Sequence, residues 1–173
     1  MSKTTIPAGG LASDSVTTAK IADDAVTAAK AGFSAGKILQ VKNVTFSTTG
    51  ASTSSTSFVD INASFKIDIT PSASDSKLLV WCHICGISNA DSSLSAVSIQ
   101  LLRDSTSIAF NENIKFGARY PQSFTTTITA LDSPSTTSQV TIKPQFRNRE
   151  SNSVNINTSG GDISEMVIME VAA

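Results

Sequence analysis

Residues 78–87 read Leu78-Leu79-Val80-Trp81-Cys82-His83-Ile84-Cys85-Gly86-Ile87, and apolar side chains fall on both faces of this run if it is extended. A strand with one face in solvent alternates apolar and polar residues, whereas a strand covered on both faces need not. The run therefore predicts a central strand, with the core on one side and a second sheet or another subunit on the other.

The sequence before this run alternates with the period of two that is typical of half-buried strands. Between Phe58 and Thr70 we expect one strand that turns Phe65, Ile67 and Ile69 inward. A strand that begins near Lys37 should hold four apolar residues on one side, with a bulge at Lys42-Asn43 where the alternation slips. These four are Leu39, Val41, Val44 and Phe46.

The sequence after the run predicts a hairpin and further short strands. Arg103-Asp104-Ser105-Thr106 is a tight-turn sequence that joins Val97–Leu101 to a partner strand at Ile108 and Phe110. The remaining strands are expected at Phe124–Leu131, Gln139–Phe146 and Ile163–Val171, and Val154, Ile156 and the turn Gly160-Gly161 introduce the last of them. Because the last strand comes so near the C-terminus, we expect it to be part of the core.

Composition supports a mainly β fold. The 173 residues include 28 Ser and 20 Thr, which favour turns and pleated surfaces over helix interiors. Turn sequences recur at short intervals, and no helical apolar pattern follows Gly36. Residues 37–173 are therefore predicted to form an antiparallel β-sandwich or jelly-roll head domain.

Residues 1–36 contain two near-copies of one phrase, Asp14–Lys20 and Asp24–Lys30, after an arm that Pro7 keeps from being helical. Each copy is long enough for a helix of about two turns, with Ser13 and Asp23 as N-caps. Such short, thinly apolar helices need neighbours, which identical chains around a symmetry axis would supply. An extended, flexible linker of Ala, Thr and Ser is the alternative.

Several function classes lack their sequence signals. A net charge of −1 without a basic patch argues against nucleic-acid binding, and no apolar run is long enough for a secretory signal or a membrane span. The nucleotide-binding glycine patterns and the G-x-S-x-G elbow do not occur. We therefore expect a soluble protein that is made in the cytoplasm, needs no cofactor and is not an enzyme.

The soft ligands of the chain are Cys82, His83 and Cys85. On a strand the two cysteines point to opposite faces, so we expect no metal site and reduced, buried thiols. His83, the single histidine, sits in a predicted core strand, which disfavours a catalytic triad. The carboxylate pairs Asp60 with Asp68 and Glu112 with Asp104 remain open as a glycosidase pair.

Surface loops offer a candidate contact site. Arg119, Tyr120, Arg147 and Arg149 bring guanidinium and aromatic groups to two loops, and such groups often contact glycans or proteins. The alternative is that Phe116 and Tyr120 pack beneath their own loop.

Several phrases resemble tail-fibre and related virion proteins of bacteriophages. They are Ala22–Lys30, Gly36–Val41, Ser57–Ile61, Ile69–Val80, Leu101–Ser105 and Val167–Val171. The resemblance covers nearly the whole chain and implies a homotrimeric β head without catalytic residues. It implies a tail fibre that contacts the host surface or, because the chain is short for such a fibre, a capsid decoration (cement) or head-fibre protein that stabilises the shell.

On this reading the protein belongs to the virion. Residues 1–36 would attach it to other tail or capsid proteins and begin the trimer, and the head would bind a host-surface glycan or protein. The residues expected to serve anchoring and trimerisation are Ile6, Leu11, Val16, Ile21, Val26 and Ala29.

Overall fold

The computed structural model describes residues 37–48, 50–89, 95–116, 123–150 and 153–173, together with Thr17 and Ile21. The chain divides into two units, Met1–Ala35 and Gly36–Ala173, and all strands of the described residues lie in the second. These strands are β1 (Ile38–Phe46), β2 (Ala51–Thr53), β3 (Val59–Asp60), β4 (Ile67–Ile69), β5 (Lys77–Asn89), β6 (Ser95–Arg103), β7 (Thr106–Phe116), β8 (Ser123–Asp132), β9 (Val140–Asn148), β10 (Val154–Ile156) and β11 (Ser164–Val171).

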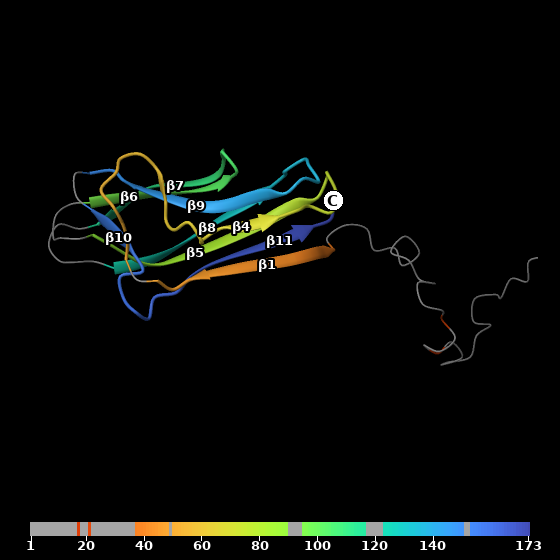
Figure 1. Ribbon diagram of the computed structural model, residues 1–173, viewed down its shortest axis with the longest axis horizontal. Coiled ribbons are helices and arrows are strands. Elements are labelled where there is room, and N and C mark those ends of the chain that lie inside the picture. The colour runs from red at the N-terminus through yellow and green to blue at the C-terminus, as the bar shows by residue number, and fades with distance from the viewer. Residues whose placement is uncertain are drawn as a thin grey trace, which may run out of the picture. The chain divides into compact units, whose positions relative to one another are not determined.

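The strands form two antiparallel sheets, as in a β-sandwich (Figure 1). In the first sheet β5 lies between β8 and β11, β1 pairs with the far side of β11, and β10 and β2 continue the sheet beyond the end of β11. In the second sheet β9 lies between β6 and the short strands β3 and β4, and β7 is the outer partner of β6. The prediction of a mainly β, antiparallel fold is confirmed.

The core fills the space between the two sheets because alternate residues of each central strand point inward. Leu78, Val80, Cys82 and Ile84 of β5 are fully buried, and so is Ile168 of β11. The second sheet contributes Val97, Ile99 and Leu101 of β6 with Ile142 and Phe146 of β9. The half-buried Arg103–Asp132 ion pair, 2.5 Å long, joins the end of β6 to the end of β8 and so ties the sheets together.

Two local predictions are wrong. Phe58–Thr70 is not one strand, because Asn62 accepts hydrogen bonds from the backbone N–H groups of Ser64 and Phe65 and makes a turn between β3 and β4. The inward direction of Phe65, Ile67 and Ile69 is nevertheless confirmed, since all three are buried.

The predicted bulge at Lys42-Asn43 is also wrong, because β1 pairs regularly with β11 there and is irregular between Ile38 and Gln40 instead. As a result Val44 and Phe46 face the core side, while Val41 is 56% exposed and Leu39 is 37% exposed on the other face.

A second irregularity lies in β5, between Ile84 and Ile87, where Gly86 has a φ of +58°. The buried side chain of Asn157 holds this region. Its Nδ2 donates to the carbonyl of Phe46, its backbone N–H donates to the carbonyl of Cys85, and its Oδ1 accepts from the hydroxyl of Ser164. The start of β11 is thereby fixed to the ends of β1 and β5.

The first and last residues of the head domain lie side by side. The backbone N–H of Ala172 donates to the carbonyl of Lys37, so the junction with residues 1–36 lies beside the C-terminus. β9 ends at the opposite end of the sheets, beside the start of β6 (Figure 1). Arg147 is the next-to-last residue of β9, so its predicted place on a loop is wrong, whereas Arg149 follows the strand.

Candidate functional site

The outer surface of the first sheet carries a group of exposed apolar side chains. Strand register aligns Val41, Met169, Leu79 and Leu131 in one row across four strands, and Val167 and Trp81 lie side by side in the next row. Leu79 is 40% exposed, Trp81 is 50% exposed and Leu131 is 62% exposed. We call these six residues the apolar face.

The apolar run at residues 78–87 lies within β5 and contributes Leu79 and Trp81 to the apolar face. Its predicted central position and its core side are confirmed, because β5 lies between β8 and β11 and its alternate residues are fully buried. The second sheet packs on the core side only, so Leu79 and Trp81 remain exposed. Cover of this surface by another subunit remains a prediction.

A shallow depression on the same surface is lined by Trp81, His83, Glu165 and Val167. The ring of His83 lies on this outer surface, where Nδ1 is 3.0 Å from the hydroxyl of Thr127 and Nε2 is 3.3 Å from Sγ of Cys85. Sequence reasoning placed His83 in a core strand and missed the contact with Cys85. The spacing of two residues between His83 and Cys85 could have indicated this contact, because it places both side chains on one face of a strand.

The two thiols do face opposite sides of β5, as predicted, and both are free, but Cys85 is only half-buried, so the prediction of burial holds for Cys82 alone. Cys82 is fully buried, and this burial raises its pKa to about 12. Within the described ranges no three His, Cys, Asp or Glu side chains are grouped so that they could hold a metal ion.

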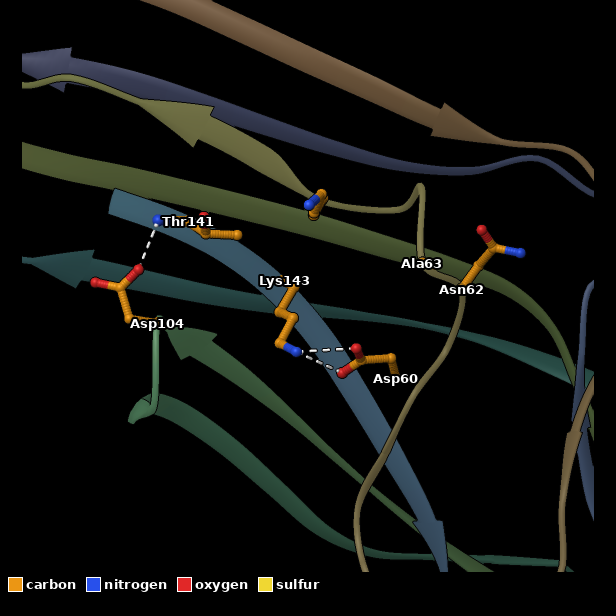
Figure 2. A pocket seen from close by; sticks show the side chains of 7 residues that line it. Asp60, Asn62, Ala63, Asp104, Thr141 and Lys143 are labelled. Carbon is orange, nitrogen blue, oxygen red and sulfur yellow. Dashed lines mark hydrogen bonds and ion pairs between the residues drawn. The ribbon is translucent and has the colours of Figure 1, made fainter. Parts of the chain in front are cut away.

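The outer surface of the second sheet is polar instead. A hollow in it is lined by Asp60, Asn62, Ala63, Lys66, Asp104, Thr141 and Lys143 (Figure 2). Because residues of β9 alternate between the two faces, Thr141, Lys143 and Gln145 all point to this side. We call the surface made by Asp60, Lys66, Asp68, Gln100, Asp104, Phe110, Thr141, Lys143 and Gln145 the polar face.

Hydrogen bonds link the side chains of the polar face. Lys143 Nζ lies 2.9 Å from the carboxylate of Asp60, which also accepts from Gln145 Nε2 at 2.7 Å. Gln145 Oε1 accepts in turn from Gln100 Nε2 at 2.9 Å. At the other end of the hollow the carboxylate of Asp104 accepts from the backbone N–H of Thr141, as Figure 2 shows.

The carboxylate pairs considered for a glycosidase do not gain support. Burial of Asp60 would by itself raise its pKa, but hydrogen bonds from Lys143 and Gln145, together with the charges of Lys143 and Lys66, lower it. An ionised Asp60 could serve only as the nucleophile or the base of such a pair. Glu112 and Asp104 contact Arg147 and Thr141, six positions apart on β9 and hence about 20 Å apart. Glycosidase pairs are closer than this.

Arg147 and Arg149, two of the predicted surface-contact residues, converge on Glu112. Arg147 Nη2 lies 3.4 Å and Arg149 Nη1 lies 2.5 Å from Glu112 Oε1. The guanidinium carbon of Arg147 is 4.5 Å from the ring centre of Phe58, and Phe58 meets Phe110 edge to face at 5.8 Å. Sequence reasoning missed Glu112 and both rings as partners of Arg147, because β3, β7 and β9 are distant in the chain.

The other predicted site residues lie mostly outside the described residues. This holds for Arg119 and Tyr120 and for the anchoring residues Ile6, Leu11, Val16, Val26 and Ala29. Ile21 is described and is 41% exposed. In the part of the chain that the structure describes, no helix is long and apolar enough to cross a membrane.

Comparison with known proteins does not identify a family. No protein-family model and no curated protein match the chain. Among solved structures it is similar to the Stig cyclase Fisc from Fischerella sp. TAU, at 16% identity and a TM-score of 0.37 over 59% of this chain and 52% of that one. A second structure of a cyclase from Fischerella sp. TAU gives 16% identity and a TM-score of 0.36, with 59% and 53% covered. The chain thus spans about half the length of these structures, and a likeness this weak carries no argument about function.

Proposed function

We propose that this protein is a non-enzymatic structural component of a bacteriophage virion. It is a homotrimeric tail fibre with a jelly-roll head, residues 1–36 attach it to other virion proteins, and the head contacts the host surface. The resemblance of the sequence to tail-fibre proteins supports this role, and one structural observation carries it. That observation is the apolar face, which a single head domain leaves in water.

The exposure of large side chains on the apolar face favours a surface that is covered in the assembled protein. Its six side chains, four in one row and two in the next, occupy roughly 200 Å² at ordinary sheet spacings. Trp81 and Leu131 are large, exposed and not needed for the core between the sheets, so their burial between subunits would add association energy at ~25 cal/mol per Å².

Three copies arranged around an axis can cover these surfaces together, because each copy presents the same sheet to its two neighbours. The junction at Lys37 and the C-terminus lie at one end of the head, so residues 1–36 of all three copies would leave from the same end. The opposite end, with Arg147 and Arg149, would then point away from the virion.

The virion role is tested by gold labelling of intact phage particles with an antibody against residues 37–173, viewed by electron microscopy. We expect label confined to the tail. Label over the whole shell would contradict the tail-fibre assignment and establish a capsid decoration protein, and particles without label would contradict any virion role.

A further inference from the structure

The polar face lies on the opposite side of the sandwich from the apolar face, since the two faces are the outer surfaces of different sheets. It would therefore stay exposed when the apolar face is covered by other copies. A surface that stays exposed after assembly is available to a ligand.

One row of the polar face crosses all the main strands of the second sheet. Register aligns Asp60 of β3, Gln145 of β9, Gln100 of β6 and Phe110 of β7. At the usual strand spacing this row is about 14 Å long. It offers a carboxylate, two amides and an aromatic ring in sequence, and Phe110 is 47% exposed.

These side chains are already held in place. Asp60 is bonded to Lys143 and Gln145, Gln145 is bonded to Gln100, and the ring of Phe110 rests against Phe58. Because their rotamers are fixed before binding, a ligand would lose less side-chain entropy on binding than at a mobile surface. Their bonding capacity is not exhausted, since a carboxylate accepts about four hydrogen bonds and an ammonium group donates three.

The charges of the polar face and the adjoining arginine cluster balance. Among the described residues, the polar face and the adjoining arginine cluster carry Asp60, Asp68, Asp104 and Glu112 against Lys66, Lys143, Arg147 and Arg149. Four carboxylates facing four cations give no net field to attract an acidic polymer. A neutral ligand with many hydroxyl groups fits better, because each hydroxyl both donates and accepts.

From this arrangement we infer that the polar face binds a neutral glycan of the host surface. One sugar ring lies in the hollow between Asp60 and Asp104, with its hydroxyls on Lys143 and both carboxylates, and a neighbouring ring packs its C–H face on Phe110. A protein partner is less favoured, because protein interfaces centre on buried apolar anchors and this surface is mainly hydrogen-bonding groups. The inference deepens the proposed host contact and rests on it.

The test is affinity electrophoresis of the full chain in gels that contain dextran, mannan or galactan as neutral polysaccharides and alginate as an acidic one. We expect retardation by at least one neutral polysaccharide and none by alginate. Lys143→Gln, Asp104→Asn and Phe110→Ser should each weaken the binding at least tenfold. Asp104 has a positive φ that Asn tolerates, so D104N keeps the turn, and Asp75→Asn in an exposed loop is its matched control.

Retardation by alginate alone, by no polysaccharide, or equally in the wild type and the polar-face variants would overturn the inference. Unfolding temperatures of the variants, measured by circular dichroism, show that a loss of binding is not a loss of fold. The two proposals fail separately. Tail label without glycan binding would support the virion role and contradict the glycan site. Glycan binding without any label on particles would support the glycan site and contradict the virion role.

Discussion

At the residue scale, Cys82 shows how completely the core excludes water. Its thiol is fully buried and its pKa is raised to about 12, whereas the thiolate is the reactive form. We therefore predict that N-ethylmaleimide leaves Cys82 unmodified in the native protein and modifies both cysteines in denaturant, as measured by peptide mass spectrometry. Rapid native labelling of Cys82 would show that β5 is not buried as described.

Gly86 is the second residue whose chemistry is set by its place in β5. An added Cβ would clash with the carboxylate of Asp162, and the φ of +58° is unfavourable for alanine. We predict that Gly86→Ala lowers the free energy of unfolding by about 1–3 kcal/mol in a urea titration. The control is Gly160→Ala, where nothing lies within 4 Å of the added carbon. Equal stability of the two variants would contradict the assigned backbone at Gly86.

At the scale of the elements, Glu170 fastens β11 to its surroundings. Its buried carboxylate accepts from Gln40 of β1 and from the backbone N–H and hydroxyl of Ser72, which precedes β5. Burial alone would raise its pKa, but the hydrogen bonds from Gln40 and Ser72 outweigh this and lower the pKa below its usual value.

The sign of this shift gives a pH dependence. A carboxyl group whose pKa is lowered by folding stabilises the fold at pH values above its unfolded pKa, and the stabilisation is lost as the pH falls through the folded pKa. We predict that urea unfolding midpoints fall as the pH drops below about 4.3, and that the fall is smaller in Glu170→Gln. The same decline in both proteins would show that Glu170 does not carry this dependence.

Much of this element-scale structure could be predicted, because burial of one face imposes a period of two on β6 and β9, and β5 has a run that is apolar on both faces. The division between β3 and β4 could not, since it depends on a local turn at Asn62 that interrupts an otherwise good strand pattern. The predicted direction of the Leu39 and Val41 side chains was also wrong. The pairing of β1 with β11 determines which face they lie on, and the local sequence does not indicate this pairing.

The candidate sites show the same limit. The sequence placed Arg147 and Arg149 on one loop, but the row from Asp60 to Phe110 needs four strands in register, and register is a property of the folded sheet. The apolar character of residues 78–87 was visible directly. That run predicted that both faces of β5 are covered. The structure shows that, within one head domain, the second sheet covers the core side and leaves the outer side exposed.

At the scale of the whole molecule, the account depends on three copies covering one another's apolar faces. Sedimentation equilibrium of the full chain tests this most directly. We predict a mass three times 18.0 kDa, and a shift to the single-chain mass in Leu131→Lys, because Leu131 is 62% exposed and its replacement changes the face and not the core. Thr106→Lys, at the exposed start of β7, is the control and should keep the wild-type mass. A wild-type mass of 18.0 kDa at micromolar concentration, or a Leu131→Lys variant that remains fully associated, would contradict the account.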